Sequence, residues 1–249
     1  MSSRARLVLI VCFSIVALVF AGLGLWQMDR LRERRAANLV ALEARSAPRI
    51  RLDSETPIPA ELNGREVSAT GRYDHERDVV LRGKAYGGSP GVEVVTPLVL
   101  EGGRTAVLVN RGFLPTPDAV TAQTDSVREF GPVRVNGTAL SLPSGGGAPL
   151  ERGGHTTWAR LDREALGARM PYQIAPIYIR QAPDTALPPF PRRLEPLPID
   201  DGPHLSYAIQ WFAFAAMAIV FGGVILKTKS ESGRKQRERE GRSVSGKRE

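Results

Sequence analysis

Residues 7–25 read LVLIVCFSIVALVFAGLGL, a run of 19 residues without a charged side chain. Residues 208–226 read AIQWFAFAAMAIVFGGVIL, a second run of 19 residues in which Gln210 is the only strongly polar member. At about 1.5 Å per residue, a helix of either run would be about 30 Å long, which matches the hydrocarbon core of a bilayer. The sequence therefore predicts two transmembrane helices, one near each end of the chain.

The distribution of charge sets the expected orientation of these spans. Residues 227–249 carry nine Lys and Arg against four Asp and Glu, and Arg4 and Arg6 precede the first span. Because segments on the cytoplasmic side are enriched in basic residues, both ends of the chain are predicted to be cytoplasmic. Four arginines between residues 30 and 35 oppose this orientation. They are interleaved with acidic residues at the start of a long segment, and long segments cross a membrane largely regardless of charge.

The predicted organisation has five parts. They are a cytoplasmic N-terminus (1–6), a first transmembrane helix (7–25), an extracytoplasmic domain (26–206), a second transmembrane helix (207–226) and a basic cytoplasmic tail (227–249). No Arg/Ser-rich targeting sequence precedes the first span, which favours a bacterial plasma membrane over an organelle. A signal peptide cleaved near Val19-Phe20-Ala21 is the alternative for the first span. The length of the run and the helical stripe that continues from Trp26 to Arg45 favour a retained helix.

Composition excludes several classes of protein. The 249 residues have a net charge of +8, but residues 26–206 hold 23 basic and 22 acidic side chains, so the excess lies at the ends. The charge therefore gives no support for a nucleic-acid partner. One cysteine and three histidines exclude zinc fingers and Cys-x-x-Cys-His haem attachment.

The middle of the chain is predicted to be rich in β-strands. Val92–Leu100 and Thr105–Phe113 form an expected hairpin across Gly102-Gly103. Further strands are expected at 67–73, 77–82, 133–140 and 177–179, and Asp162 is expected to cap a short helix through Ala168. The predicted fold is an α+β membrane protein, in which two transmembrane helices flank an antiparallel β-rich extracytoplasmic domain, either a compact sheet or a small barrel. The proline-rich stretch 183–203 is expected to be an extended spacer, and the tail after Leu226 to be disordered.

Several chemical motifs have structural interpretations. Gly87-Gly88-Ser89-Pro90-Gly91 matches a serine-hydrolase pattern, but Pro90 has no N–H for an oxyanion hole. His75 is predicted to be a turn residue and His155 a solvated loop residue. For Asn110-Arg111-Gly112, the favoured interpretation is structural, with Arg111 over the sheet or paired with Glu93. The alternative is that Arg111 faces the membrane or another protein.

One group of residues points to a ligand site near the outer membrane surface. His204, Tyr207 and Trp211 share one stripe of the second helix, and Trp26 and Arg30 stand at the same depth on the first. Anchoring in lipid headgroups is one interpretation. The other is a haem site, with His204 as the axial iron ligand, the aromatic rings on the macrocycle and Arg30 on a propionate. Small residues on each span would let the helices pack closely: Ala17, Ala21 and Gly24 on one, and Ala215, Ala218 and Gly222 on the other.

An ordered set of motifs resembles the surfeit locus protein 1 family of cytochrome c oxidase assembly factors. The matching motifs, in family order, are Leu25-Trp26-Gln27-x-x-Arg30, Gly71-x-Tyr73-Asp74-His75, Gly91-Val92-x-Val94-Val95-Thr96-Pro97-Leu98, Val107-Leu108-Val109-Asn110-Arg111-Gly112-Phe113-x-Pro115, Trp158 followed by Asp162, Pro176-Ile177-Tyr178-Ile179, and His204-Leu205-x-Tyr207-x-x-x-Trp211. Gly202-Pro203 departs from the family pattern, which has Asn-x before the histidine.

The resemblance implies a non-enzymatic assembly factor that helps to insert haem a into the oxidase catalytic subunit. In bacterial members, the histidine that corresponds to His204 is implicated in haem binding. The implied cofactor is transiently bound haem a, and the implied partners are the catalytic subunit, membrane lipids and haem a synthase. The alternative is a membrane-anchored extracytoplasmic scaffold or binding domain that has no role with haem.

Overall fold

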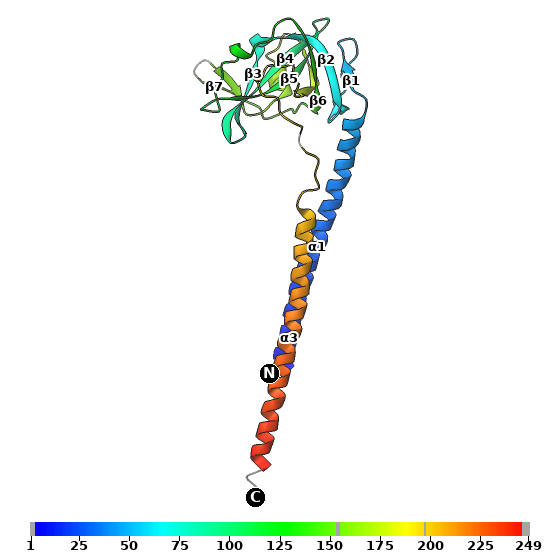
Figure 1. The fold of residues 1–249 in the computed structure, drawn as a ribbon, viewed down its shortest axis with the longest axis vertical. Coiled ribbons are helices and arrows are strands. Elements are labelled where there is room, and N and C mark those ends of the chain that lie inside the picture. The colour runs from blue at the N-terminus through cyan, green and yellow to red at the C-terminus, as the bar shows by residue number, and fades with distance from the viewer. Residues whose placement is uncertain (1–2, 153–154, 197, 246–249) are drawn as a thin grey trace. The chain divides into compact units, whose positions relative to one another are not determined.

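A computed structural model describes residues 3–152, 155–196 and 198–245 of the chain. The chain divides into two units, one formed by Met1–Leu39 with Ile199–Glu249 and the other by Val40–Pro198. Figure 1 shows the elements of both units along the chain.

Two long helices dominate the first unit. α1 (Ser3–Ser46) and α3 (His204–Ser245) contain the two apolar runs, and both are long and apolar enough to cross a membrane. They lie side by side in Figure 1, and Phe20 of α1 stacks on Trp211 of α3 with ring centroids 5.7 Å apart. The expected small faces are confirmed, since Ala17, Ala215 and Ala218 are buried and the ring of Phe212 lies against Gly24.

The helices extend beyond the predicted spans at both ends. The predicted helical continuation past Trp26 is confirmed, because α1 runs without a break to Ser46. The predicted disorder after Leu226 is wrong, because α3 continues as a helix to Ser245. Glu, Lys, Arg and Gln dominate that segment, and these residues have high intrinsic helix propensity.

In its described residues, the second unit contains nine strands and one short helix. The strands are β1 (Ile50–Leu52), β2 (Glu66–Tyr73), β3 (Val79–Tyr86), β4 (Ser89–Leu100), β5 (Thr105–Pro115), β6 (Pro132–Ser141), β7 (Pro149–Arg152), β8 (His155–Trp158) and β9 (Gln173–Gln181). Short 3-10 turns lie at Ala60–Leu62, His75–Arg77 and Asp125–Val127, and the helix α2 spans Arg163–Gly167. The predicted cap is confirmed, because the Asp162 side chain accepts hydrogen bonds from the backbone N–H groups of Glu164 and Ala165.

Five of the strands close into a small barrel. The order β2-β6-β9-β5-β4 is completed by pairing of β4 with β2, where Gly71 stands opposite Leu100 and Tyr73 opposite Leu98. Figure 1 shows these strands curling around a common centre. At the closing seam a Cβ on Gly71 would overlap the carbonyl group of Val99, so only glycine fits there. β3, β8 and β7 extend the sheet beyond β4.

The prediction of an antiparallel sheet is correct only in part. The β4–β5 hairpin is antiparallel as expected, whereas β1–β2, β3–β8 and β5–β9 are parallel pairs. Hydrophobic alternation along one strand carries no information about the direction of its neighbour, and these parallel partners are far apart in the sequence.

Two apolar clusters stabilise the second unit (Val40–Pro198), which is called the β domain below. One fills the barrel with side chains from all five barrel strands, among them Val67, Leu98, Val109, Val135 and Ile177, and also includes Leu52 of β1. The other packs α2 and β8 on the outer face of the sheet, around Leu108, Trp158 and Leu166. Because strand faces alternate, Leu108 and its neighbour Val109 serve different clusters, so the inner strand β5 is buried on both faces.

Candidate functional site

The turn before α3 sets the position of His204. The Asp200 carboxylate accepts a hydrogen bond from the Gly202 N–H, and Gly202 adopts a φ of 66°. The Tyr207 N–H then donates to the Pro203 carbonyl at 3.1 Å, which starts the helix. A positive φ is readily adopted by glycine and is tolerated by asparagine. Gly202 therefore adopts this turn without strain.

The imidazole of His204 is held by the first helix. Its Nδ1 lies 2.9 Å from the side-chain oxygen of Gln27. An amide oxygen only accepts hydrogen bonds, so this contact assigns the imidazole proton to Nδ1. In the described part of the chain, Nε2 has no hydrogen-bond partner. In its neutral form, the ring therefore carries an unused lone pair on Nε2.

His204 shares a cavity with two arginines. The cavity has a volume of about 440 Å³ and is lined by Arg30, Glu33, Arg34, Gly202, Pro203 and His204. Arg30 Nη1 lies 2.5 Å from Glu33 Oε2, with 53% of the Arg30 side chain exposed. Arg34 Nε donates to the backbone carbonyl of Asp200 at 3.2 Å. The lining of the cavity thus combines an imidazole with two guanidinium groups.

The five residues expected to form the site are only partly brought together. His204 and Arg30 line one cavity, as predicted. Trp26 and Tyr207 are 55% and 46% exposed and are not among the residues that line it. Trp211 packs between Phe20 and Phe214, so its ring serves the contact between the helices.

Two residues that line or support the site were not predicted to do so. Gln27 was noted only as part of the Leu25-Trp26-Gln27-x-x-Arg30 motif, and Arg34 only as one of four arginines between residues 30 and 35. Arg34 follows Arg30 at i+4, and that spacing places both side chains on one helix face. No comparable local signal exists for Gln27, because its partner is 177 residues away in the chain.

The β domain contains a second cluster of charged residues. Arg111 is fully buried, and its Nη2 lies 2.7 Å from Glu129 Oε1. Arg193 contacts the same carboxylate oxygen at 3.0 Å, and the Arg111 guanidinium lies over the ring of Tyr73 at 5.0 Å. The structural interpretation of Arg111 is confirmed. The predicted pairing with Glu93 is wrong, because that carboxylate accepts a hydrogen bond from Asn110.

Burial dominates the electrostatics of this cluster. Burial raises the pKa of the Tyr73 hydroxyl far above its ordinary value, against the opposing effect of Arg111. Burial also lowers the pKa of Arg193, while Glu129 acts in the opposite direction. Both directions follow because a low dielectric disfavours the charged form of each group. The cluster is consistent with an internal structural role.

The other two histidines are far less suited to bind a ligand. His75 lies in the 3-10 turn His75–Arg77 and is buried, with its Nε2 2.9 Å from the Glu129 carbonyl oxygen. The prediction that it is an ordinary turn residue missed this burial, since its partner is 54 residues away. His155 is exposed, as predicted, but lies in strand β8 instead of a loop.

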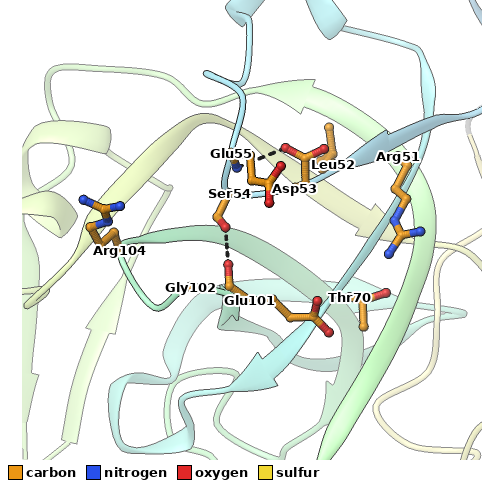
Figure 2. A pocket seen from close by; sticks show the side chains of 9 residues that line it. All are labelled: Arg51, Leu52, Asp53, Ser54, Glu55, Thr70, Glu101, Gly102 and Arg104. Atoms are coloured by element: carbon orange, nitrogen blue, oxygen red, sulfur yellow. Dashed lines mark hydrogen bonds between the residues drawn. The ribbon is translucent and has the colours of Figure 1, made fainter.

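A larger cavity in the β domain has a different chemistry. Its volume is about 670 Å³, and Figure 2 shows the acidic residues Asp53, Glu55 and Glu101 in the view between Arg104 on one side and Arg51 on the other. The Ser54 hydroxyl donates to the Glu101 carbonyl across it. The lining residues include no histidine, cysteine or methionine. This cavity therefore offers charge of both signs but no ligand of the kind that haem iron prefers.

Comparisons with known proteins agree with the sequence motifs. The SURF1 family model matches residues 14–216. An uncharacterized SURF1-like protein of Mycobacterium tuberculosis is 28% identical over 227 residues, which cover 84% of this chain and 78% of the relative. A SURF1-like protein of Rickettsia bellii is 24% identical over 247 residues, which cover 95% of this chain and 96% of the relative. The matched region runs from the first apolar helix to the first turns of the second, and on this basis the chain belongs to the SURF1 family.

Proposed function

We propose that this protein is a membrane-bound assembly factor for cytochrome c oxidase, which holds haem a through His204 while the haem is passed to the oxidase catalytic subunit. The observation that carries the proposal is the unpartnered Nε2 of His204, in a cavity that also contains Arg30 and Arg34. Family membership supports the role in oxidase assembly.

Residues at the cavity suit the iron and the carboxylates of a haem. The Nε2 lone pair of His204 is a suitable axial ligand for iron, and a guanidinium is a suitable partner for a propionate carboxylate. A volume of about 440 Å³ falls within the range of about 300–1,000 Å³ for small-molecule sites. Bound haem a would supply the redox-active iron of the mature oxidase. The chain itself would bind and orient this cargo.

A binding role is also favoured over hydrolysis. Ser89 is the first residue of strand β4, which continues to Leu100, whereas a serine nucleophile elbow leads into a helix. Pro90 follows Ser89 and has no N–H to donate. The Gly-x-Ser-x-Gly motif therefore lacks the geometry of a hydrolase.

The proposed location is the bacterial plasma membrane. α1 and α3 would each cross the bilayer, with both termini in the cytoplasm and the β domain outside, as the basic tail favours. His204 and Arg30 would then lie at the outer surface, within reach of an oxidase subunit and of haem a synthase. Fusions of reporter enzymes to each terminus test this orientation, and an external C-terminus would contradict it.

The binding proposal is tested by purifying the full chain from cells that make haem a. The wild-type protein is expected to carry haem with a distinct absorbance spectrum, and His204→Ala is expected to lose most of it. His155→Ala is the matched control, because it removes an exposed imidazole from strand β8. Equal haem in wild type and His204→Ala, or none in either, would contradict the proposal.

The role in assembly is tested separately in a deletion strain. Its membranes are expected to show less haem a absorbance and slower oxygen consumption, both restored by the wild-type gene. If oxidase spectra and activity stay intact in the strain, a scaffold without a role in haem delivery becomes the better description.

A further inference from the structure

We infer that Gln27 is a positioning residue that holds His204 as its Nδ1–H tautomer, so that Nε2 is the atom presented to a ligand. The inference rests on the proposed function only for the identity of that ligand. The hydrogen bond itself, 2.9 Å between His204 Nδ1 and Gln27 Oε1, belongs to the protein without ligand.

The contact joins the two helices of the first unit. Gln27 is on α1 and His204 is the first residue of α3, and the side chains of both are partly buried. The two helices also pack closely in the turns next to this contact: Ala208 is 1% exposed, and Phe20 stacks on Trp211. Because the acceptor comes from the opposite helix, the tautomer of His204 depends on the pairing of α1 with α3.

The Nε2 side of the ring faces a residue without a side chain. A Cβ on Gly202 would lie 3.6 Å from His204 Cδ2 and 3.8 Å from Nε2. Gly202 therefore borders the edge of the ring that carries the lone pair, and it leaves that edge unobstructed. His204 and Gly202 both line the cavity that also contains Arg30 and Arg34.

The contact with Gln27 affects ligand affinity because of how imidazole binds metals. A neutral ring has one proton and one lone pair, and the hydrogen bond at one nitrogen decides which nitrogen is free to coordinate. Removing such a supporting partner typically lowers metal affinity about 10-fold to 100-fold. A flipped amide would have the opposite effect, because an NH₂ group would donate to Nδ1 and leave the proton on Nε2. Whether the oxygen or the NH₂ group of Gln27 faces Nδ1 therefore decides which nitrogen of His204 can bind a ligand.

The first experiment measures the tautomer without any ligand. The full chain, haem-free and labelled with ¹⁵N-histidine, is placed in lipid nanodiscs in mildly alkaline buffer, and the His204 signals are identified by their loss in His204→Ala. Wild type is expected to show a protonated Nδ1 and an unprotonated Nε2. Gln27→Leu is expected to shift the population toward Nε2–H, and Gln27→Glu to keep the proton on Nδ1. Gln210→Leu is the matched control, since it makes the same change at an exposed position of α3.

The second experiment titrates the same proteins with iron protoporphyrin IX. Gln27→Leu is expected to bind about 10-fold more weakly than wild type. Gln27→Glu and Gln210→Leu are expected to bind nearly as well as wild type.

The outcomes separate this inference from the proposed function. A proton on Nε2 in the wild-type protein overturns the inference whatever the titration shows. Equal binding by Gln27→Leu and wild type, with His204→Ala defective, overturns the inference and leaves the proposed function standing. A Gln27-dependent tautomer with full binding by His204→Ala supports the positioning role of Gln27 and overturns haem ligation by His204.

Discussion

The helix pair and the β domain both gather arginines, but the two regions use them differently. In the β domain the side chains of Arg111 and Arg193 are 0% and 4% exposed, and both contact Glu129. In the helix pair, Arg30 is about half exposed, pairs with Glu33 on its own helix, and borders the cavity of His204. One set of charges is enclosed within a fold, whereas the other faces space that a ligand can enter.

The degree of burial separates structural arginines from binding arginines. A buried charge is tolerated only when it is paired, so removing a partner affects folding. An exposed ion pair contributes little to stability, so its removal leaves the fold intact and affects only what binds there. Substitutions in the β domain should therefore lower stability, and substitutions around His204 should change ligand binding alone.

The largest effect on stability is expected for Glu129→Gln. This change leaves Arg111 and Arg193 buried without their shared carboxylate, which costs about 3–5 kcal/mol when a buried pair is broken. Chemical denaturation of the full chain in detergent measures the loss. Glu76→Gln is the control, because that carboxylate is 77% exposed in its pair with Arg128 and should change stability by less than about 1 kcal/mol. Similar losses of stability in the two variants would contradict the distinction between buried and exposed ion pairs.

The closing seam of the barrel is tested by Gly71→Ala. The added Cβ would overlap the Val99 carbonyl group, and overpacking of this kind costs about 1–3 kcal/mol. Gly167→Ala in α2 is the matched control, because no atom lies within 4 Å of its added Cβ and alanine is the better helix former. The same denaturation curves measure both. An unchanged midpoint for Gly71→Ala would show that the seam can open without cost.

A smaller effect on stability, with a clear effect on binding, is expected at Arg30. Arg30→Ala should retain severalfold less haem than Arg30→Lys, because lysine keeps a positive charge beside the carboxylate. Arg30→Lys should in turn retain less than wild type, because only arginine offers two parallel donors to a carboxylate. Neither variant should shift the unfolding midpoint by more than the equivalent of about 1 kcal/mol, since the pair with Glu33 is exposed. Absorbance of haem per purified protein measures retention. If both variants retain equal haem, Arg30 is a lipid anchor and not a ligand contact.

The smallest effect is expected in the acid stability of the β domain. Backbone N–H groups of Gly147, Ala165 and Glu164 hold the pKa of Asp162 below its ordinary value of 3.8. The lowered pKa means that the ionised form stabilises the fold at all pH values above 3.8, and that this contribution is lost as the pH falls through the lower value of the folded state. Asp162→Asn should therefore be less stable than wild type near neutral pH, and the difference should shrink below pH 3.8. Unfolding midpoints across this range measure the difference, and a constant gap would contradict the expectation.

Local features of the fold could be predicted from the sequence with good accuracy. The β4–β5 hairpin was predicted from two β-branched runs on either side of Gly102-Gly103, because turn geometry and strand preference depend on neighbouring residues. The cap at Asp162 was predicted for the same reason. Parallel pairing of β5 with β9 was not predictable, because each strand has the same alternation whichever way its neighbour runs.

In the candidate site too, local features were predictable and contacts between distant residues were not. The sequence placed His204 at the start of an apolar helix and Arg30 just beyond another, because long apolar runs reveal where helices begin and end. It could not decide which aromatic rings would surround the histidine, and Trp211 proved to pack on Phe20. Packing between helices depends on their relative rotation, which no local pattern fixes.

By itself, the sequence determined two apolar helices, a β-rich domain between them in the chain, and an imidazole at the start of the second helix. These features follow from composition and spacing over short stretches of chain. The folded chain was needed to see that Arg111 pairs with Glu129 instead of Glu93, that β2 closes a barrel on β4, and that His204 Nδ1 lies against the side-chain oxygen of Gln27. Each of these contacts joins residues distant in the chain, and which of many chemically equivalent partners meet is settled only when the whole chain packs.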